Sequence, residues 1–166
     1  MKVSILIPCY NERSTIAAIL HRIRAVSLDH ELEIVVVDDA STDGTRELLQ
    51  GELRPLLQQL ILHESNQGKG AALSSGLRSI SGDAVIIQDA DLEYDPQDYP
   101  RLLEPFERGL ADVVYGSRFI SGSAHRVLYF WHSVANRALT GLENSLTGQN
   151  LGVWHSGLRA YSREFL

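Results

Sequence analysis

The stretch Glu33-Ile-Val-Val-Val37 is mostly β-branched and runs into two acids, Asp38 and Asp39. Consecutive apolar residues without alternation are typical of a strand that is covered on both faces. Further strands are predicted on either side of it, at residues 3–8, 60–63, 84–88 and 112–115. Helices are predicted between the strands, at residues 14–26, from 45 to a limit at Pro55, at 70–79 and at 97–108. This alternation predicts a three-layer α/β/α fold around a mainly parallel sheet.

The composition indicates one globular domain over residues 1–166, because 44% of the residues are hydrophobic and 22% are charged. The 15 basic and 21 acidic residues give a net charge of −6 without a basic block, which disfavours a nucleic-acid-binding protein. Cys9 is the single cysteine, so an internal disulfide is excluded and a reducing compartment is favoured. No apolar run reaches the length of about 18 residues that a membrane span needs, and the run at residues 3–8 is too short for a signal peptide.

The last five residues, Ser162-Arg-Glu-Phe-Leu166, resemble the first turns of a helix capped by Ser162. Because the chain stops there, we expect the domain to be truncated at its C-terminus. We expect a cytoplasmic location, with the cytoplasmic face of a membrane as the alternative.

Four polar clusters follow the predicted strands, at residues 10–12, 38–39, 66–70 and 89–91. Ligands of open α/β sheets bind at the carboxyl ends of the strands, so the clusters predict one cleft. Asp89 and Asp91 offer hard oxygen ligands that suit Mg²⁺ or Mn²⁺, with phosphate oxygens of a substrate completing the coordination. A polar turn that closes a strand is the alternative for this pair.

The clusters at residues 38–39 and 66–70 can be interpreted either as ligand-binding groups or as ordinary turns that lead into helices. Asp38 and Asp39 follow a strand, where a carboxylate can accept hydrogen bonds from a ribose hydroxyl or a base N–H, or their loop only leads into a helix capped by Ser41 or Thr42. The glycine-rich stretch at residues 63–70 precedes a helix, whose N-terminus and Lys69 favour an anion, or it is an ordinary turn. It lacks the G-x-x-x-x-G-K-[ST] pattern, and no G-x-G-x-x-G follows the first strand, which disfavours kinases and dinucleotide dehydrogenases.

Two arginines and an aromatic stretch follow the fifth predicted strand. Arg118 and Arg126 are suited to bidentate bonds with a diphosphate, although a surface ion pair of Arg118 with Asp95 or Glu93 is the alternative. Residues 127–146 are apolar and aromatic, which favours a core helix over an acceptor or membrane-surface groove.

Five motifs occur together, in an order and spacing that resemble family 2 glycosyltransferases of the Rossmann-like, nucleotide-sugar-binding GT-A fold. The nearest likeness is to dolichyl- and polyprenyl-phosphate sugar synthases. The motifs are Ile7-Pro-Cys-Tyr-Asn-Glu12, Val37-Asp-Asp-Ala-Ser-Thr-Asp-Gly-Thr45, Asn66-Gln-Gly-Lys-Gly-Ala-Ala72, Gln88-Asp-Ala-Asp-Leu-Glu-Tyr-Asp-Pro96 and Val114-Tyr-Gly-Ser-Arg-Phe119.

The resemblance implies a role for residues in each motif. Asp89 and Asp91 match metal-binding acids, with Glu93 at the position of a further ligand, and Asp91 is the catalytic residue on which turnover should depend most. The metal would neutralise the departing nucleoside diphosphate. The residues expected to bind the donor are Pro8, Tyr10, Glu12, Asp39, Lys69, Asp89, Ala90, Asp91, Arg118 and Arg126.

The chain departs from the family pattern at Leu151-Gly-Val-Trp-His-Ser-Gly-Leu-Arg-Ala-Tyr161, where Val153 and His155 replace the expected carboxylates. A hydroxyl acceptor needs a general base, whereas a phosphate acceptor is already ionised. The departure therefore favours a lipid phosphate as acceptor, with His155 serving as the base for a hydroxyl as an alternative. Packing of His155 beside Trp154, and altered or lost activity, are the other interpretations.

The predicted function is metal-dependent, inverting transfer of a sugar from a GDP- or UDP-linked donor to a polyprenyl phosphate, and association with a membrane surface is a further expectation. Transfer to a hydroxyl of a cell-wall or surface glycan is one alternative. A non-catalytic module that binds nucleotide sugars is another. A nucleotidyltransferase is disfavoured, because Cys9-Tyr-Asn-Glu12 stands where its glycine-rich loop would follow the first strand.

Overall fold

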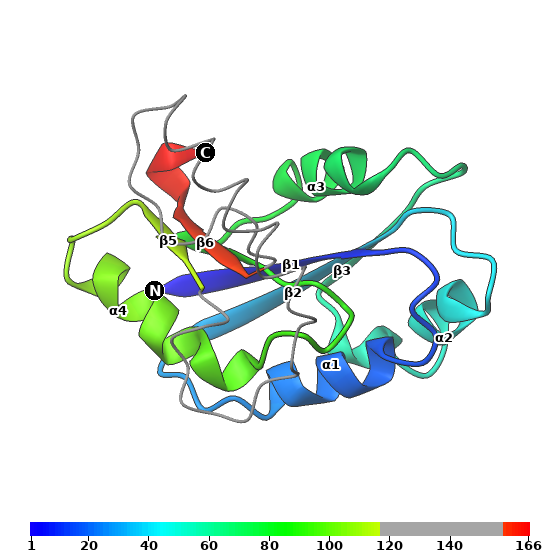
Figure 1. Ribbon diagram of the computed structural model, residues 1–166, viewed down its shortest axis with the longest axis horizontal. Helices are drawn as coiled ribbons and strands as arrows, with labels where there is room; N and C mark the ends of the chain where they lie inside the picture. Colours follow the sequence, from blue (N-terminus) through cyan, green and yellow to red (C-terminus); the bar gives the residue numbers. More distant parts are fainter. Residues whose placement is uncertain (117–157) are drawn as a thin grey trace, which may run out of the picture.

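The computed structural model describes residues 1–116 and 158–166, which form one six-stranded sheet with helices on both faces (Figure 1). The strands lie in the order β3-β2-β1-β4-β6-β5. Their bounds are β1 Lys2–Cys9, β2 Glu31–Asp38, β3 Gln59–Leu62, β4 Ala84–Ile87, β5 Val113–Tyr115 and β6 Arg159–Ser162. All neighbouring pairs among β1 to β4 are parallel, whereas β6 runs antiparallel to both β4 and β5. The predicted mainly parallel sheet is confirmed.

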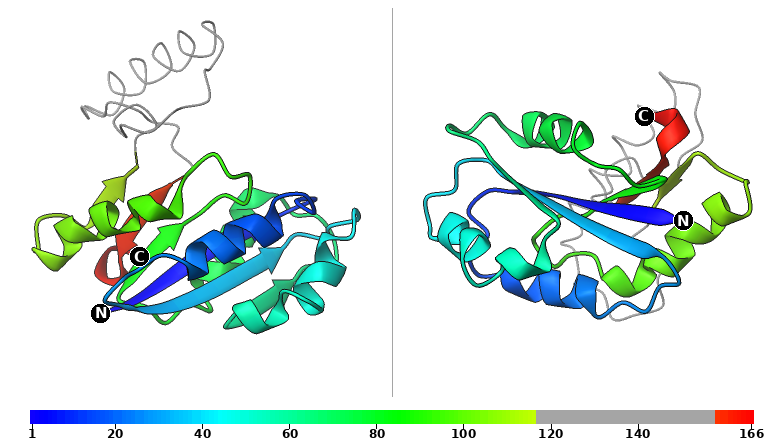
Figure 2. Two further views of the ribbon diagram at one scale, coloured as in Figure 1. Left: turned by 90° about the horizontal axis from the view of Figure 1, so that it is seen from below. Right: turned by 180° about the vertical axis from the view of Figure 1, so that it is seen from behind.

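The helices divide between the two faces of the sheet, as the rear view in Figure 2 shows: α3 covers one face, and α1, α2 and α4 lie on the other. Their bounds are α1 Ile16–Arg24, α2 Thr45–Gln50, α3 Lys69–Leu77 and α4 Tyr99–Glu107. The helices α1, α2 and α4 lie within predicted helical segments, and α3 begins one residue before its predicted segment. Short 3₁₀ turns, η1 Arg54–Leu56 and η2 Pro96–Asp98, follow α2 and precede α4.

Side chains of the central strands alternate between two apolar cores. Ile5 and Ile7 of β1 pack in the core on the side of α1, while Leu6 packs in the core on the side of α3. This follows from the two-residue repeat of a strand, which sends successive side chains to opposite faces. Gly76 of α3 lies so close to the sheet that a Cβ there would be 2.1 Å from Cδ1 of Leu6. The small residue therefore sets how near α3 sits to β1.

A buried polar network joins the strands at their amino-terminal ends, away from the loops described below. Glu33 is almost fully buried, and its Oε2 accepts hydrogen bonds from Ser4 Oγ at 2.5 Å and from Ser81 N at 2.7 Å. Its Oε1 accepts from Ser81 Oγ at 2.6 Å and pairs with Lys2 Nζ at 3.1 Å. Burial alone would raise the pKa of Glu33, but these bonds outweigh it and lower the pKa from 4.5 to about 2.

The C-terminal segment differs from the prediction. It forms the strand β6 and then a short 3₁₀ helix, η3 Arg163–Phe165, rather than the opening of an α-helix. Ser162 makes no cap bond, because its hydroxyl donates to Asp112 Oδ1 at 3.0 Å. The strand was not predicted, since only Ala160 of its four residues is fully buried and the apolar pattern is too short to reveal it.

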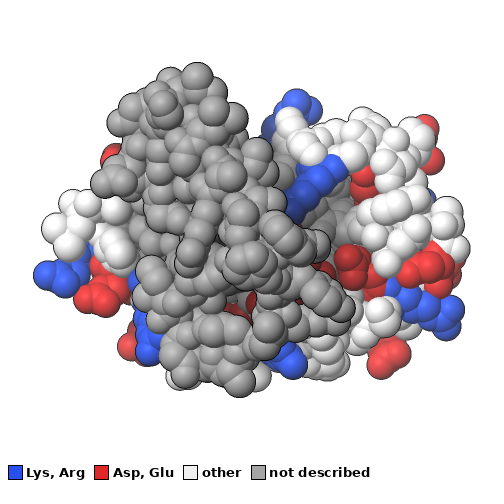
Figure 3. All heavy atoms as spheres, in the orientation of Figure 1, with Lys and Arg blue, Asp and Glu red and all other residues white. Residues whose placement is uncertain are grey.

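No helix among residues 1–116 and 158–166 is long and apolar enough to cross a membrane. On the face of the described residues that Figure 3 shows, Lys and Arg form small separate groups among Asp and Glu. The predicted aromatic helix at residues 127–146 lies outside the described residues.

Candidate functional site

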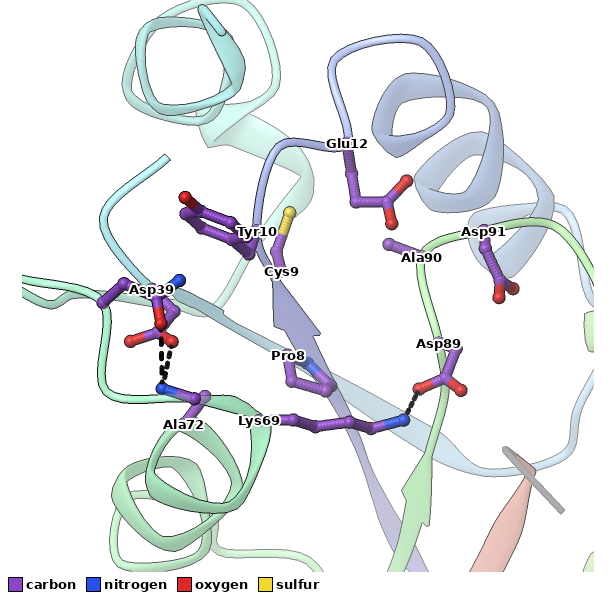
Figure 4. Close-up of a pocket in the computed structure, with 12 residues that line it drawn as sticks. Pro8, Cys9, Tyr10, Glu12, Asp39, Lys69, Ala72, Asp89, Ala90 and Asp91 are labelled. Atoms are coloured by element: carbon purple, nitrogen blue, oxygen red, sulfur yellow. Dashed lines mark hydrogen bonds and ion pairs between the residues drawn. The ribbon is translucent and has the colours of Figure 1, made fainter. Parts of the chain in front are cut away.

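A cavity of about 340 Å³ opens at the carboxyl ends of β1, β2 and β4 (Figure 4). It brings together the four polar clusters expected to outline one cleft. All the predicted donor-binding residues that the structure describes line it: Pro8, Tyr10, Glu12, Asp39, Lys69, Asp89, Ala90 and Asp91. Cys9, Asn66, Gly68 and Ala72 complete the lining.

The loop after β1 is held by the loop after β2. Asn11 has a positive φ of 57°, and its Oδ1 accepts a hydrogen bond from Thr42 N at 2.8 Å while its N donates to Ser41 Oγ at 2.9 Å. Asparagine tolerates this left-handed conformation better than most residues. These bonds position the flanking residues Tyr10 and Glu12 at the cavity.

Capping of α2 by Ser41 or Thr42 is wrong: the helix begins at Thr45 with Gly44 at its N-cap, and Ser41 and Thr42 bond to Asn11 instead. Asp43 accepts the hydrogen bonds at the start of this helix: its Oδ1 accepts from Thr45 N at 3.0 Å and from Thr45 Oγ1 at 2.5 Å. Burial would raise the pKa of Asp43, but the hydrogen bonds from Thr45 and its other partners lower it below its ordinary value.

Asp38 and Asp39 point to different places although they are adjacent. Asp38 is fully buried at the end of β2 and binds Arg46 Nε through Oδ2 at 2.7 Å. Asp39 lines the cavity. Arg46 also donates to the carbonyl of His63 at 2.6 Å, which fixes the end of β3 beside β2.

The Asp39 carboxylate is only 3% exposed and holds the loop between β3 and α3. Its Oδ1 accepts from His63 Nδ1 at 2.7 Å and from Gln67 N at 3.0 Å, and its Oδ2 accepts from Gly68 N at 2.7 Å. Burial would raise the pKa of Asp39, but the bonds from Gln67, His63 and Gly68 lower it. Asp39 is therefore an ionised acceptor at neutral pH.

His63 is a site residue that the sequence analysis did not identify. Because a carboxylate only accepts hydrogen bonds, His63 Nδ1 carries the proton that it donates to Asp39. Its other nitrogen, Nε2, lies 2.9 Å from the hydroxyl of Ser75 on α3. The only sequence signal for this chain of bonds is a histidine at the end of a predicted strand, and Ser75 has no such signal.

Asp89 and Asp91 lie on the loop that follows β4, and both line the cavity. Lys69 is the first residue of α3, and its Nζ lies 2.6 Å from Asp89 Oδ1. Asp91 Oδ1 accepts from Glu93 N at 3.0 Å, so the backbone of Glu93 orients this carboxylate. Two carboxylates that line the same cavity are a donor set that fits a hard divalent cation such as Mg²⁺ or Mn²⁺.

The protein supplies two carboxylates to such a site. Among residues 1–116 and 158–166, no group of three His, Cys, Asp or Glu side chains is arranged to hold a metal. Glu93 is exposed and does not line the cavity, so its role as a further ligand stays a prediction. Arg118, Arg126 and His155 lie outside the described residues, and their predicted roles also stay predictions.

Cys9 adds an apolar, uncharged group to the wall of the cavity. Burial, together with the nearby Asp38 carboxylate, raises the pKa of its thiol far above the ordinary value. The thiol therefore stays neutral at physiological pH.

Comparison with known proteins places the chain in a family. The family model described as glycosyl transferase family 2 matches residues 4–166. The chain belongs to glycosyl transferase family 2. The resemblance found in the sequence is thereby confirmed.

Curated relatives of this family 2 chain act on a lipid carrier according to their names. The undecaprenyl-phosphate 4-deoxy-4-formamido-L-arabinose transferase of Yersinia enterocolitica is 35% identical over 169 residues, which cover 99% of this chain and 50% of the relative. The enzyme of the same name from Photorhabdus laumondii is 34% identical, with the same coverage. The chain thus spans about half the length of the curated relatives it matches.

Solved structures confirm the GT-A fold expected for this family 2 chain. Glucosyl-3-phosphoglycerate synthase of Mycobacterium tuberculosis in complex with UDP has a TM-score of 0.70 and 28% identity, covering 99% of this chain and 58% of that one. The mannosyltransferase PcManGT of Pyrobaculum calidifontis, solved with GDP-Man and Mn²⁺, has a TM-score of 0.66 and 29% identity, covering 99% and 45%.

Proposed function

We propose that this chain forms the donor-binding part of a glycosyltransferase that moves a sugar from a UDP- or GDP-linked donor to a polyprenyl phosphate. The observation that carries the proposal is the single cavity at the carboxyl ends of the strands. It places an ionised Asp39, the cation of Lys69 and the Asp89–Asp91 pair around one space. A nucleotide sugar carries groups that complement each of them.

The nucleoside end of the donor is assigned to the part of the cavity beside Asp39. Asp39 accepts hydrogen bonds only, so it suits a ribose hydroxyl or a base N–H such as those of uracil and guanine. The cavity volume of about 340 Å³ falls at the lower end of the range for small-molecule sites, roughly 300 to 1,000 Å³. Solved family neighbours hold UDP and GDP-Man, which supports both nucleotides as candidates.

The diphosphate end is assigned to Asp89 and Asp91. These carboxylates would hold Mg²⁺ or Mn²⁺, and the cation supplies charge neutralisation for the nucleoside diphosphate as leaving group. The Mn²⁺ in the mannosyltransferase neighbour supports a divalent cation. The residues of this chain orient the donor so that an acceptor approaches the anomeric carbon from the side opposite the diphosphate, which gives inversion in a single displacement.

A polyprenyl phosphate is the acceptor that the relatives support. The names of the curated relatives specify undecaprenyl phosphate, and those proteins match 99% of this chain. A phosphate oxygen is already ionised at neutral pH and needs no general base. Because such an acceptor is anchored in lipid, the proposal includes work at a membrane surface, on the cytoplasmic side where nucleotide sugars are available.

The test offers UDP- and GDP-sugars with Mg²⁺ or Mn²⁺ and undecaprenyl phosphate in detergent micelles, and it measures nucleotide release and lipid-linked sugar. Asp91→Asn should lower turnover about 100-fold or more while the thermal transition is unchanged. Glu52→Gln, which removes an exposed acid on the loop after α2, is the matched control and should keep full activity.

The outcomes separate the alternatives. Sugar transfer to a glycan hydroxyl but not to the lipid would replace the acceptor in the proposal. Tight nucleotide binding without any release of sugar would indicate a binding module and would refute catalysis.

A further inference from the structure

An ion pair crosses the candidate metal site. Lys69 Nζ lies 2.6 Å from Asp89 Oδ1, joining the first turn of α3 to the loop after β4 (Figure 4). The Lys69 side chain is 56% exposed and that of Asp89 is 19% exposed. The ammonium thus occupies a position next to one of the oxygens that a divalent cation would need.

The charge balance of the cavity explains why a cation is held there. Glu12, Asp39, Asp89 and Asp91 all line it, and Lys69 is the only lysine or arginine among the described residues that does. Like charges raise the free energy of such a cluster, and a cation at Asp89 reduces it. Lys69 occupies Oδ1 of Asp89, and a metal at the same carboxylate would be repelled by the ammonium beside it, so the two cations compete for Asp89.

We propose that Lys69 balances the charge of Asp89 while no metal is bound; it would leave Asp89 when a divalent cation binds there and would turn to the diphosphate of the donor. The proposal rests on the function proposed above. Its consequence is that the metal binds weakly alone and strongly together with the nucleotide, because the diphosphate gives the displaced ammonium a new partner. Lys69 is in this sense a positioning residue that orders the binding of metal and donor.

The geometry around Lys69 allows this exchange. The backbone that leads into Lys69 is fixed, because the preceding Gly68 and Gln67 donate their N–H groups to the buried Asp39 carboxylate. Its side chain is free to move, because the stem is exposed and exposed ion pairs contribute little stability. Among residues 1–116 and 158–166, no atom beyond the chain neighbours and the helix backbone lies within 4 Å of the place where a Cβ of Gly68 or Gly70 would stand, so these residues leave space beside the lysine.

The direction of the exchange also fits. Lys69 is the first residue of α3, and the N-terminus of a helix attracts anions through its free N–H groups. A diphosphate that approaches this end of α3 meets the ammonium there. Lys69 can therefore leave Asp89 without losing a charged partner.

The test measures Mn²⁺ binding by the electron paramagnetic resonance signal of free Mn²⁺, first without nucleotide. Lys69→Met should bind Mn²⁺ about five- to tenfold more tightly than wild type, because the metal no longer has to break the ion pair or bind beside a cation. Lys69→Arg keeps the charge and should stay near wild type. Arg78→Met, which removes a cation at the other end of the same helix, is the matched control and should change little.

The second arm repeats the titration with saturating UDP or GDP. The nucleotide should tighten Mn²⁺ binding in the wild type by a larger factor than in Lys69→Met, because coupling through the lysine is lost in the variant. General damage to the site should lower metal affinity, so a gain in the first arm separates this role from a structural one.

Three results have distinct meanings. Mn²⁺ affinity in Lys69→Met equal to that of wild type overturns the inference while leaving the proposed function intact, provided that Asp91→Asn abolishes binding. An equal gain in Arg78→Met also overturns it, because the effect would be one of overall charge. If the wild type binds no Mn²⁺ even with nucleotide, the metal-dependent function fails together with the inference.

Discussion

Replacement of His63 by leucine should weaken the hold on Asp39. His63 Nδ1 donates to the nearly buried Asp39 carboxylate at 2.7 Å, and Nε2 lies 2.9 Å from Ser75 Oγ. A hydrogen bond to a charged group contributes about 1.5–3 kcal/mol, and a neutral one about 1 kcal/mol. Because Gln67 N and Gly68 N still hold Asp39, we expect the free energy of unfolding to fall by about 2–3 kcal/mol in His63→Leu.

Graded variants distinguish the hydrogen bond from general damage. His63→Asn keeps an amide N–H near the place of Nδ1 and should recover about 1 kcal/mol relative to His63→Leu. Ser75→Ala removes only the partner of Nε2 and should cost about 1 kcal/mol. His21→Leu, at an exposed histidine of α1, is the control and should be close to neutral.

The assays are urea unfolding and calorimetric titration with UDP and GDP. Affinity for the fitting nucleotide should fall about fivefold in His63→Leu, which corresponds to the loss of about 1 kcal/mol from a less well-oriented Asp39. It should recover in His63→Asn. A His63→Leu protein as stable as the wild type, or an asparagine variant no better than the leucine one, would refute the reasoning.

Three further predictions concern the scaffold. The pKa of Glu33 is lowered from 4.5 to about 2, so its bonds stabilise the fold above pH 4.5 and this stabilisation is lost as the pH falls toward 2. In urea unfolding, wild type should therefore be more stable than Glu33→Gln by about 2 kcal/mol at pH 7, and the difference should vanish by pH 2. Gly76→Ala should lower the free energy of unfolding by about 1–2 kcal/mol, because the new methyl group would collide with Leu6 in the core. Asp43→Ala should cost about 1–2 kcal/mol by removing the acceptor for Thr45 at the start of α2.

Each of these has an opposing result. A stability difference for Glu33→Gln that does not change between pH 7 and 3 would mean that the carboxylate is not the group responsible. An unchanged or raised melting temperature in Gly76→Ala would show that Leu6 rotates away at little cost, leaving the better helix propensity of alanine. An Asp43→Ala protein of wild-type stability would show that water replaces the carboxylate.

The sequence was sufficient to predict the strands that form the centre of the sheet, because β1 and β2 consist of long apolar runs. It was also sufficient to predict that the loops after β1, β2, β3 and β4 meet, since the carboxyl ends of parallel strands share one edge. Both predictions depend on burial of many residues, which leaves a strong pattern.

Features that depend on single contacts could not be predicted in this way. Nothing in Asp38-Asp39 tells which acid faces the cavity; the answer depends on Arg46, which draws Asp38 inward. Ser41 and Thr42 are good capping residues by type, but α2 begins later, at Thr45, and Ser41 Oγ and Thr42 N bond to Asn11 of the loop after β1 instead. Local propensity yields to such contacts because each is worth about as much as a cap.

The placement of β6 between β4 and β5 has a consequence for how this protein could be re-engineered. Tyr115 and Arg159 are paired in neighbouring strands, and Gly116 N donates to the carbonyl of Leu158 at 2.9 Å. The end of β5 and the start of β6 are therefore held side by side by these contacts. Because Gly116 and Leu158 are joined in this way, we expect a replacement of the sequence between them to leave the pairing of β5 with β6 in register.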